Sequence, residues 1–169
     1  MEIATVSQTC LRIKGKRASL IIDPDKTLRV KTTGDAVVVL NTGEDVDTSK
    51  IEGQRLIIRG VGEYEVGGIK IAASKVEKDL FYQILVDGVT IALANAGSIE
   101  RLKEKLGGHH VLLFNADAKV DQALIATLEP RVVILYGENI ADLVDAVKTQ
   151  KYTVTLEKLP EKMQTVLLQ

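Results

Sequence analysis

Short apolar runs separated by turn residues dominate the first half of the chain and predict β-strands. Residues 11–13 and 19–22 flank a Lys-Gly-Lys turn, which is the pattern of a β-hairpin. Residues 36–40 form a continuous apolar run of strand length. The dipeptide Asp87-Gly88 favours a tight turn between two further strands. The other strands expected in this half lie at 55–59, 69–73, 80–86 and 89–94.

The second half of the chain alternates strands with helices. Apolar residues at helical spacing predict one helix after Ser98, a second after Asp117 and a third after Asn139, each beginning at a residue that can cap it. The third helix would place Val147 on its apolar face. Strands are expected at 111–114, 132–135, 152–156 and 164–168. Strands first, then alternating strands and helices, predict one α/β layered domain over residues 1–169.

Composition and charge narrow the function classes. The formal net charge is −1 and no long run of like charges occurs, so the chain lacks the basic surface that binds nucleic acid. Cys10 is the only cysteine, which excludes an internal disulfide and a cysteine cluster for zinc, and its apolar context predicts a core residue. Neither a signal peptide nor an apolar run of roughly 20 residues is present, so we expect a cytoplasmic protein without a membrane partner.

Four phrases, spread over nearly the whole chain, resemble one family. They are Ile21-Ile22-Asp23-Pro24, Gly-Val-Gly-Glu-Tyr-Glu-Val-Gly-Gly at 60–68, Leu-Glu-Pro-Arg-Val-Val-Ile at 128–134 and Leu-Pro-Glu-Lys-Met at 159–163. In these phrases the chain is similar to the metallo-β-lactamase superfamily, in the branch of Zn-dependent hydrolases related to L-ascorbate-6-phosphate lactonase. The resemblance implies a shortened αβ/βα sandwich of the metallo-β-lactamase type.

The same resemblance implies that the metal-binding residues are missing. In that family, His and Asp side chains hold Zn²⁺ or a similar ion, which activates a water molecule for hydrolysis. The corresponding positions of this chain are Gln8, Thr42, Glu44, Val46, Asp47, Ala96 and Gly137. The chain has two histidines, His109 and His110, which adjoin each other before a strand and therefore point to opposite faces. We accordingly expect no metal and no other cofactor.

Glycines of the second phrase are interpreted as backbone elements. The glycines Gly60, Gly62, Gly67 and Gly68 lie in a segment that reads as strand and not as helix, which argues against a nucleotide-binding loop. Their expected role is to supply positive φ angles in a turn and a bulge.

Two functions stay open at this point. The first is a catalytically inactive metallo-β-lactamase-like protein with a binding, regulatory or structural role, an unknown ligand or protein partner, and a homodimeric state. The second is a divergent hydrolase of lactones, esters or phosphodiesters. It would use a cation held by Glu44 and Asp47, because carboxylate oxygens suit Mg²⁺ or Ca²⁺.

Overall fold

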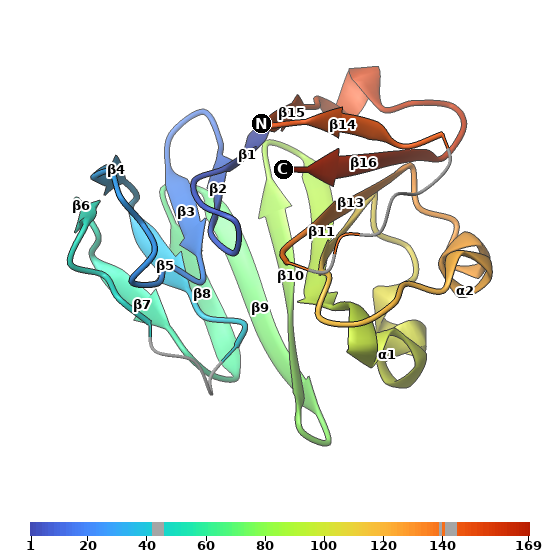
Figure 1. Cartoon of the computed structure of the whole chain (residues 1–169), viewed down its shortest axis with the longest axis horizontal. Coiled ribbons are helices and arrows are strands. Elements are labelled where there is room, and N and C mark those ends of the chain that lie inside the picture. The colour runs from blue at the N-terminus through green and yellow to red at the C-terminus, as the bar shows by residue number, and fades with distance from the viewer. Residues whose placement is uncertain (42–45, 139, 141–144) are drawn as a thin grey trace.

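Two β-sheets packed face to face form the body of the protein in a computed structural model of the chain (Figure 1). The structure describes residues 1–41, 46–138, 140 and 145–169. The strands of the two large sheets are β1 (Glu2–Thr5), β2 (Leu11–Lys14), β3 (Ser19–Ile22), β5 (Ala36–Val38), β7 (Leu56–Ile58), β8 (Gly62–Val66), β9 (Ile69–Val76), β10 (Asp79–Val86), β11 (Val89–Asn95), β12 (Val111–Asn115), β13 (Val132–Tyr136), β14 (Val147–Thr149), β15 (Lys151–Thr153) and β16 (Gln164–Leu168). The other elements are β4 (Thr32–Thr33), β6 (Ile51–Glu52), the α-helices α1 (Ile99–Leu106) and α2 (Gln122–Thr127), and the 3-10 helices η1 (Ala96–Ser98) and η2 (Leu156–Lys158).

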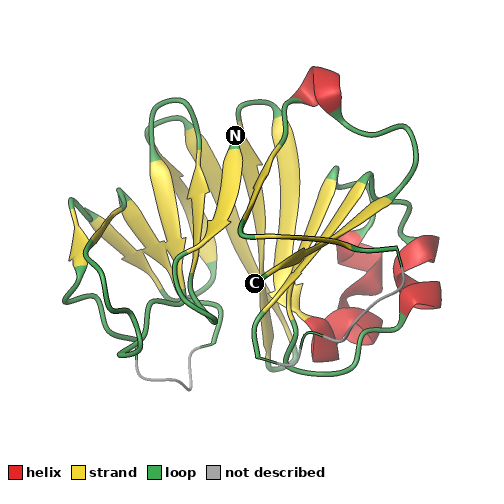
Figure 2. Ribbon diagram, turned by 45° about the horizontal axis from the view of Figure 1, so that its top comes forward, coloured by secondary structure: helices red, strands yellow, loops and turns green. Residues whose placement is uncertain are grey.

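The strand order separates an antiparallel region from a parallel one. The six-stranded sheet has the order β15-β1-β2-β3-β5-β7, and the eight-stranded sheet has the order β14-β16-β13-β12-β11-β10-β9-β8. Strands β8 to β11 form an antiparallel meander, whereas β11, β12, β13 and β16 are parallel. Parallel neighbours require crossover connections, and α1 and α2 follow β11 and β12 along the chain. Figure 2 shows these helices gathered at one side of the molecule.

Alternation of apolar and polar residues explains how the sheets pack. In β9, Ile69, Ile71 and Ala73 are buried in the core between the sheets, whereas Lys70 on the opposite face is exposed. Strand β13 is buried at every position, because a second apolar cluster with α1 and α2 covers its outer face. The expected α/β sandwich is therefore confirmed. The first half of the chain contains antiparallel strands, but β3, β5 and β7 pair in parallel.

The amino-terminal cap of α2 differs from the prediction. Helix α2 begins at Gln122, and the Asp121 carboxylate caps it by accepting hydrogen bonds from the amides of Ala123 (2.9 Å) and Leu124 (3.2 Å). The predicted start after Asp117 is wrong, because that carboxylate accepts a hydrogen bond from the Gly97 amide at 2.8 Å instead.

Ser98 precedes α1 as predicted but makes no side-chain capping bond, because it ends the preceding 3-10 turn. Its hydroxyl hydrogen-bonds Asp79 instead, on the neighbouring hairpin.

The expected third helix falls largely outside the described residues, which omit 139 and 141–144. Its predicted carboxyl end is wrong, because Val147 begins β14 and pairs in parallel with Val166 of β16. Periodicity along the sequence cannot show that a segment pairs with a distant strand. Among the described residues, no helix has the length and apolar character needed to cross a bilayer.

Three of the four glycines in the 60–68 phrase hold positive φ angles. Gly67 (φ +54°) and Gly68 (φ +84°) form the two-residue turn between β8 and β9, and Gly62 has φ +153°. Positive φ at both central positions is typical of a type I′ hairpin turn, which matches the twist of its strands. Gly67 also passes close to β3, since a Cβ there would lie 2.5 Å from the Ala18 Cβ.

We predict that Gly67→Ala destabilises the protein by about 1–2 kcal/mol or more, because it combines a left-handed backbone with a steric overlap. Gly60→Ala is the matched control, since Gly60 lacks a positive φ and a Cβ there would contact nothing within 4 Å. The free energies of unfolding from urea titrations measure both effects. Equal stability of the two variants would contradict a backbone role for Gly67.

Candidate functional site

The ends of several strands meet at one end of the sandwich, which we call the mouth. Parallel strands β11, β12 and β13 run in register, so that Asn95, Asn115 and Tyr136 lie side by side at their carboxyl ends. In open parallel sheets, this edge is where ligands usually bind. Asn41, which follows β5 in the other sheet, reaches the same place: the Asn95 side-chain amide donates a hydrogen bond to Asn41 Oδ1 at 2.8 Å.

A buried carboxylate holds Asn41 in position. Asp23 follows β3, is 5% exposed and has φ +43°, a left-handed conformation that Asp tolerates better than most residues. Asp23 Oδ1 accepts hydrogen bonds from the amides of Leu40 (2.7 Å) and Asn41 (3.3 Å). Asp23 Oδ2 accepts another from the Asn41 side-chain amide at 3.0 Å. Asp23, Asn41 and Asn95 thus form a hydrogen-bonded chain between the two sheets, the amide bridge.

Tyr82 makes a second link between the sheets close to the amide bridge. Its hydroxyl, from β10 of the eight-stranded sheet, donates a hydrogen bond of 2.6 Å to the Val39 carbonyl beyond β5. Burial, with a smaller effect from the charge of Asp23, raises the pKa of the Tyr82 phenol well above its usual value. The hydroxyl therefore stays protonated and remains a donor over the range in which proteins are stable.

Two of the residues aligned with the family's main metal motif have structural contacts. Val46 packs against the apolar cluster on the outer face of the six-stranded sheet, which contains Cys10, Ile21, Leu28, Val37, Val39 and Ile51. Asp47 Oδ1 accepts a hydrogen bond from the Ser49 amide at 2.8 Å, and hydrogen bonding to Ser49 lowers the pKa of this carboxyl. Thr42 and Glu44 lie outside the described residues.

The remaining predicted positions, Gln8, Ala96 and Gly137, differ in where they lie. Gln8 is exposed and lines a cavity of about 420 Å³ at the mouth together with Gly137. Gly137 has φ +108°, and a Cβ there would overlap the Asn115 side-chain oxygen. Ala96 is buried in the second apolar cluster beneath α1, so Asn95 is the residue that β11 presents to the mouth. No group of three His, Cys, Asp or Glu side chains in the described part of the chain is arranged to hold a metal.

Asn41 and Asn95 were missed as functional candidates by the sequence analysis. Each is the first polar residue after a buried apolar strand, and this position was the available signal. Their hydrogen bond joins residues 54 positions apart, so the sequence could not show that they meet.

Solved structures with the same architecture identify the fold, although no family model and no curated protein matches the sequence. A Thermotoga maritima protein, provisionally assigned as a Zn-dependent hydrolase of the metallo-β-lactamase superfamily, superposes with a TM-score of 0.73 at 16% identity. The superposition covers 99% of this chain and 98% of that one. The chain has the metallo-β-lactamase fold.

Two further structures support this fold over most of the chain. A provisionally assigned metal-dependent hydrolase from Parabacteroides distasonis gives a TM-score of 0.68 at 11% identity, covering 99% of this chain and 93% of that one. A diphosphatase of the PhnP family gives 0.52 at 12% identity, covering 94% of this chain and 80% of that one. At such identities the likeness concerns the fold and not the activity.

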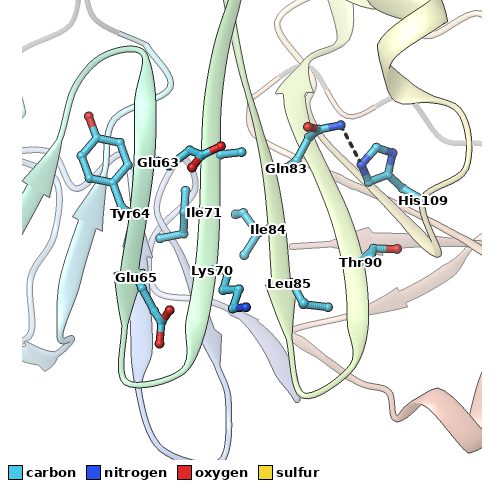
Figure 3. Close-up of a pocket in the computed structure, with 11 residues that line it drawn as sticks. Glu63, Tyr64, Glu65, Lys70, Ile71, Gln83, Ile84, Leu85, Thr90 and His109 are labelled. Atoms are coloured by element: carbon cyan, nitrogen blue, oxygen red, sulfur yellow. Dashed lines mark hydrogen bonds between the residues drawn. The ribbon is translucent and has the colours of Figure 1, made fainter.

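Both histidines of this metallo-β-lactamase fold lie in the segment between α1 and β12, and their side chains contact the eight-stranded sheet away from the amide bridge. His110 Nδ1 accepts a hydrogen bond from the Thr90 amide at 3.1 Å. His109 Nδ1 lies 2.9 Å from the Leu106 carbonyl, which requires a proton on Nδ1, so Nε2 is the acceptor for the Gln83 amide at 3.3 Å. Figure 3 shows Gln83 and His109 beside a surface groove of about 540 Å³ over strands β8 to β11. The expectation that the two rings point to opposite faces is not confirmed, because Gln83 and Thr90 lie on the same face of the sheet.

A double-mutant cycle with Asn41→Ala and Asn95→Ala tests the amide bridge. If the two side chains interact directly, the free energies of unfolding are non-additive by about 0.5–1.5 kcal/mol. Asn41→Ala combined with Gln83→Ala is the control pair, because Gln83 contacts His109 and not the mouth. Additive effects for Asn41 and Asn95 would show that the bridge does not stabilise the fold.

The burial of the Cys10 thiol can be tested by chemical labelling. Burial, assisted by the charges of Asp25 and Asp23, raises the pKa of its thiol to about 12. At about pH 8 the thiol is therefore protonated as well as buried, and we predict labelling by a disulfide reagent at least about 100-fold slower than in unfolded protein. Rapid labelling of the native protein, compared with the same chain in denaturing urea, would contradict this burial.

Proposed function

We propose that the chain is a catalytically inactive protein with a metallo-β-lactamase fold and a binding or structural role. The observation that carries the proposal is the amide bridge, in which Asn41 and Asn95 join the two sheets directly at the mouth. The resemblance assigns the metal to this end of the sandwich. Neutral amides that are already hydrogen-bonded to each other and to Asp23 are poor replacements for the His and Asp ligands of a catalytic ion.

Ligand chemistry supports the same conclusion. A catalytic zinc site keeps about three protein ligands and leaves one position for water. Val46 and Ala96 have apolar side chains packed in clusters, and Gly137 has no side chain that could bind an ion. The described residues at the mouth therefore do not fit a zinc ion, and we derive no hydrolytic step for them.

The alternative is a hydrolase of lactones, esters or phosphodiesters that uses a cation bound by carboxylates. It needs Glu44 and Asp47 together, but Asp47 is engaged in the turn with Ser49. This contact favours the non-catalytic proposal. The experiment below would replace the non-catalytic proposal if it found this hydrolase activity.

Metal content and turnover decide between the two. We expect protein purified after supplementation with zinc and manganese to hold far less than one equivalent of either metal. We also expect no hydrolysis of lactones, phosphodiesters or β-lactams above the rate without protein. Metal analysis of the dialysed protein and single-substrate assays with added metal provide the measurements.

Metal near one equivalent, together with turnover that disappears in the Glu44→Ala, Asp47→Ala double variant, would establish the hydrolase. Glu157→Ala with Glu161→Ala is the matched control, because it removes two exposed carboxylates that lie outside the mouth.

A further inference from the structure

Strand β8 ends the eight-stranded sheet, and no strand of the described residues pairs with its outer backbone edge. The two-residue turn at Gly67-Gly68 pairs Val66 with Ile69 as a hydrogen-bonded pair. Hydrogen-bonded pairs alternate along an antiparallel ladder, so Tyr64 and Ile71 form the next one. The amides and carbonyls of Glu63 and Glu65 consequently point away from β9. An edge of this kind is a template for one more strand.

The side chains along this edge carry negative charge in a regular pattern. Glu63 and Glu65 are both exposed and occupy alternate positions of β8 (Figure 3), so that they lie on one face about 7 Å apart. Lys70 and Ala72, opposite them on β9, supply one positive charge for the two carboxylates. Arg55, which lines a cavity together with Glu65, pairs with Asp35 at 3.1 Å. The edge therefore keeps an excess of negative charge.

Open space borders the carboxyl-terminal part of the same edge. A cavity of about 210 Å³ separates it from the edge strand of the six-stranded sheet, and its lining consists of Arg55, Leu56, Glu65, Val66 and Gly67. The backbone of Glu65 is thus not covered by β7.

We propose that β8 binds an extended segment of a partner protein that carries Arg or Lys at alternate positions. The added strand would pair with the free amides and carbonyls of Glu63 and Glu65, in the mode known as β-augmentation. Its alternate basic side chains would lie directly opposite the two carboxylates, which is the favourable arrangement for cross-strand charges. This inference names a class of partner for the proposed binding role. It does not depend on whether the mouth is catalytically inactive.

A second copy of this chain is a poor occupant of the same edge. Antiparallel pairing of two β8 strands about a two-fold axis places Glu63 and Glu65 opposite carboxylates of the other copy. Like charges directly opposite each other destabilise a strand pair. The pattern thus discriminates against self-pairing and in favour of a basic partner.

The test uses a fluorescent peptide, Thr-Arg-Val-Arg-Val-Thr, and the full-length protein, with binding followed by anisotropy. A peptide with Glu in place of both Arg residues is its charge control. A third peptide keeps both Arg residues but is N-methylated at the amides that would pair with β8. We expect the arginine peptide to bind at least about tenfold more tightly than either control peptide, because both charge and backbone pairing contribute.

Charge reversal in the protein provides the second arm. Glu63→Lys with Glu65→Lys should weaken binding of the arginine peptide by at least about tenfold and strengthen binding of the glutamate peptide. Glu157→Lys with Glu161→Lys changes the net charge equally at other exposed positions and should leave the affinity unchanged.

Three results would overturn the proposal. They are no binding of the arginine peptide up to about 1 mM, equal binding of the N-methylated peptide, and equal loss in the two charge-reversed proteins. The N-methylated peptide is compared on the unaltered protein, so this arm does not depend on folding of a variant. Metal content and turnover play no part in any arm, so a failure here is distinguishable from a failure of the proposed function.

Discussion

The apolar contact between the inner faces of the two sheets is the constraint on which the rest of the structure depends. Side chains such as Ile13, Ile71 and Ile134 are almost completely buried there, although they come from distant parts of the chain. Because side chains alternate between faces, a shift of one residue in any strand would turn its apolar set toward water. This contact fixes the register of every long strand, and the register places Asn95, Asn115 and Tyr136 side by side at the mouth.

At the mouth the apolar contact ends, and polar groups of both sheets must find partners. Asp23 satisfies two backbone amides and one side-chain amide, and Asn41 passes the connection on to Asn95. The three hydrogen bonds to the Asp23 carboxylate hold residues 40 and 41, which follow β5, in position. Gly137 has φ +108°, a conformation that residues with a side chain rarely adopt, and it lies against the Asn115 side chain. These contacts make the mouth a structural joint, which is the physical basis for proposing that the protein is not a hydrolase.

The two ends of the eight-stranded sheet differ in what covers them. Helices α1 and α2 pack on the parallel strands, where the second apolar cluster needs cover. The outer face of β8 to β10 has polar or charged residues at alternate positions, among them Glu63, Lys70 and Gln83, and needs no helix. Surface charge and a free backbone edge thus occur together at β8. Binding at the edge of β8 is compatible with the amide bridge at the mouth, because the two involve different parts of the sheet.

The sequence by itself determined the long strands, the helix after Ser98, the burial of Cys10 and the type of fold, because apolar periodicity and short phrases are local properties of the chain. It also indicated the positive φ angles of Gly67 and Gly68. Tertiary structure alone decided that Val147 joins a strand, that Asp121 caps α2, and which residues occupy the mouth. Short strands such as β1 and the edge strand β14 carry little periodicity of their own and form because a partner strand is already in place. The amide bridge depends in the same way on tertiary structure, because Asn41 and Asn95 follow strands of different sheets. No local sequence pattern shows that these two residues meet.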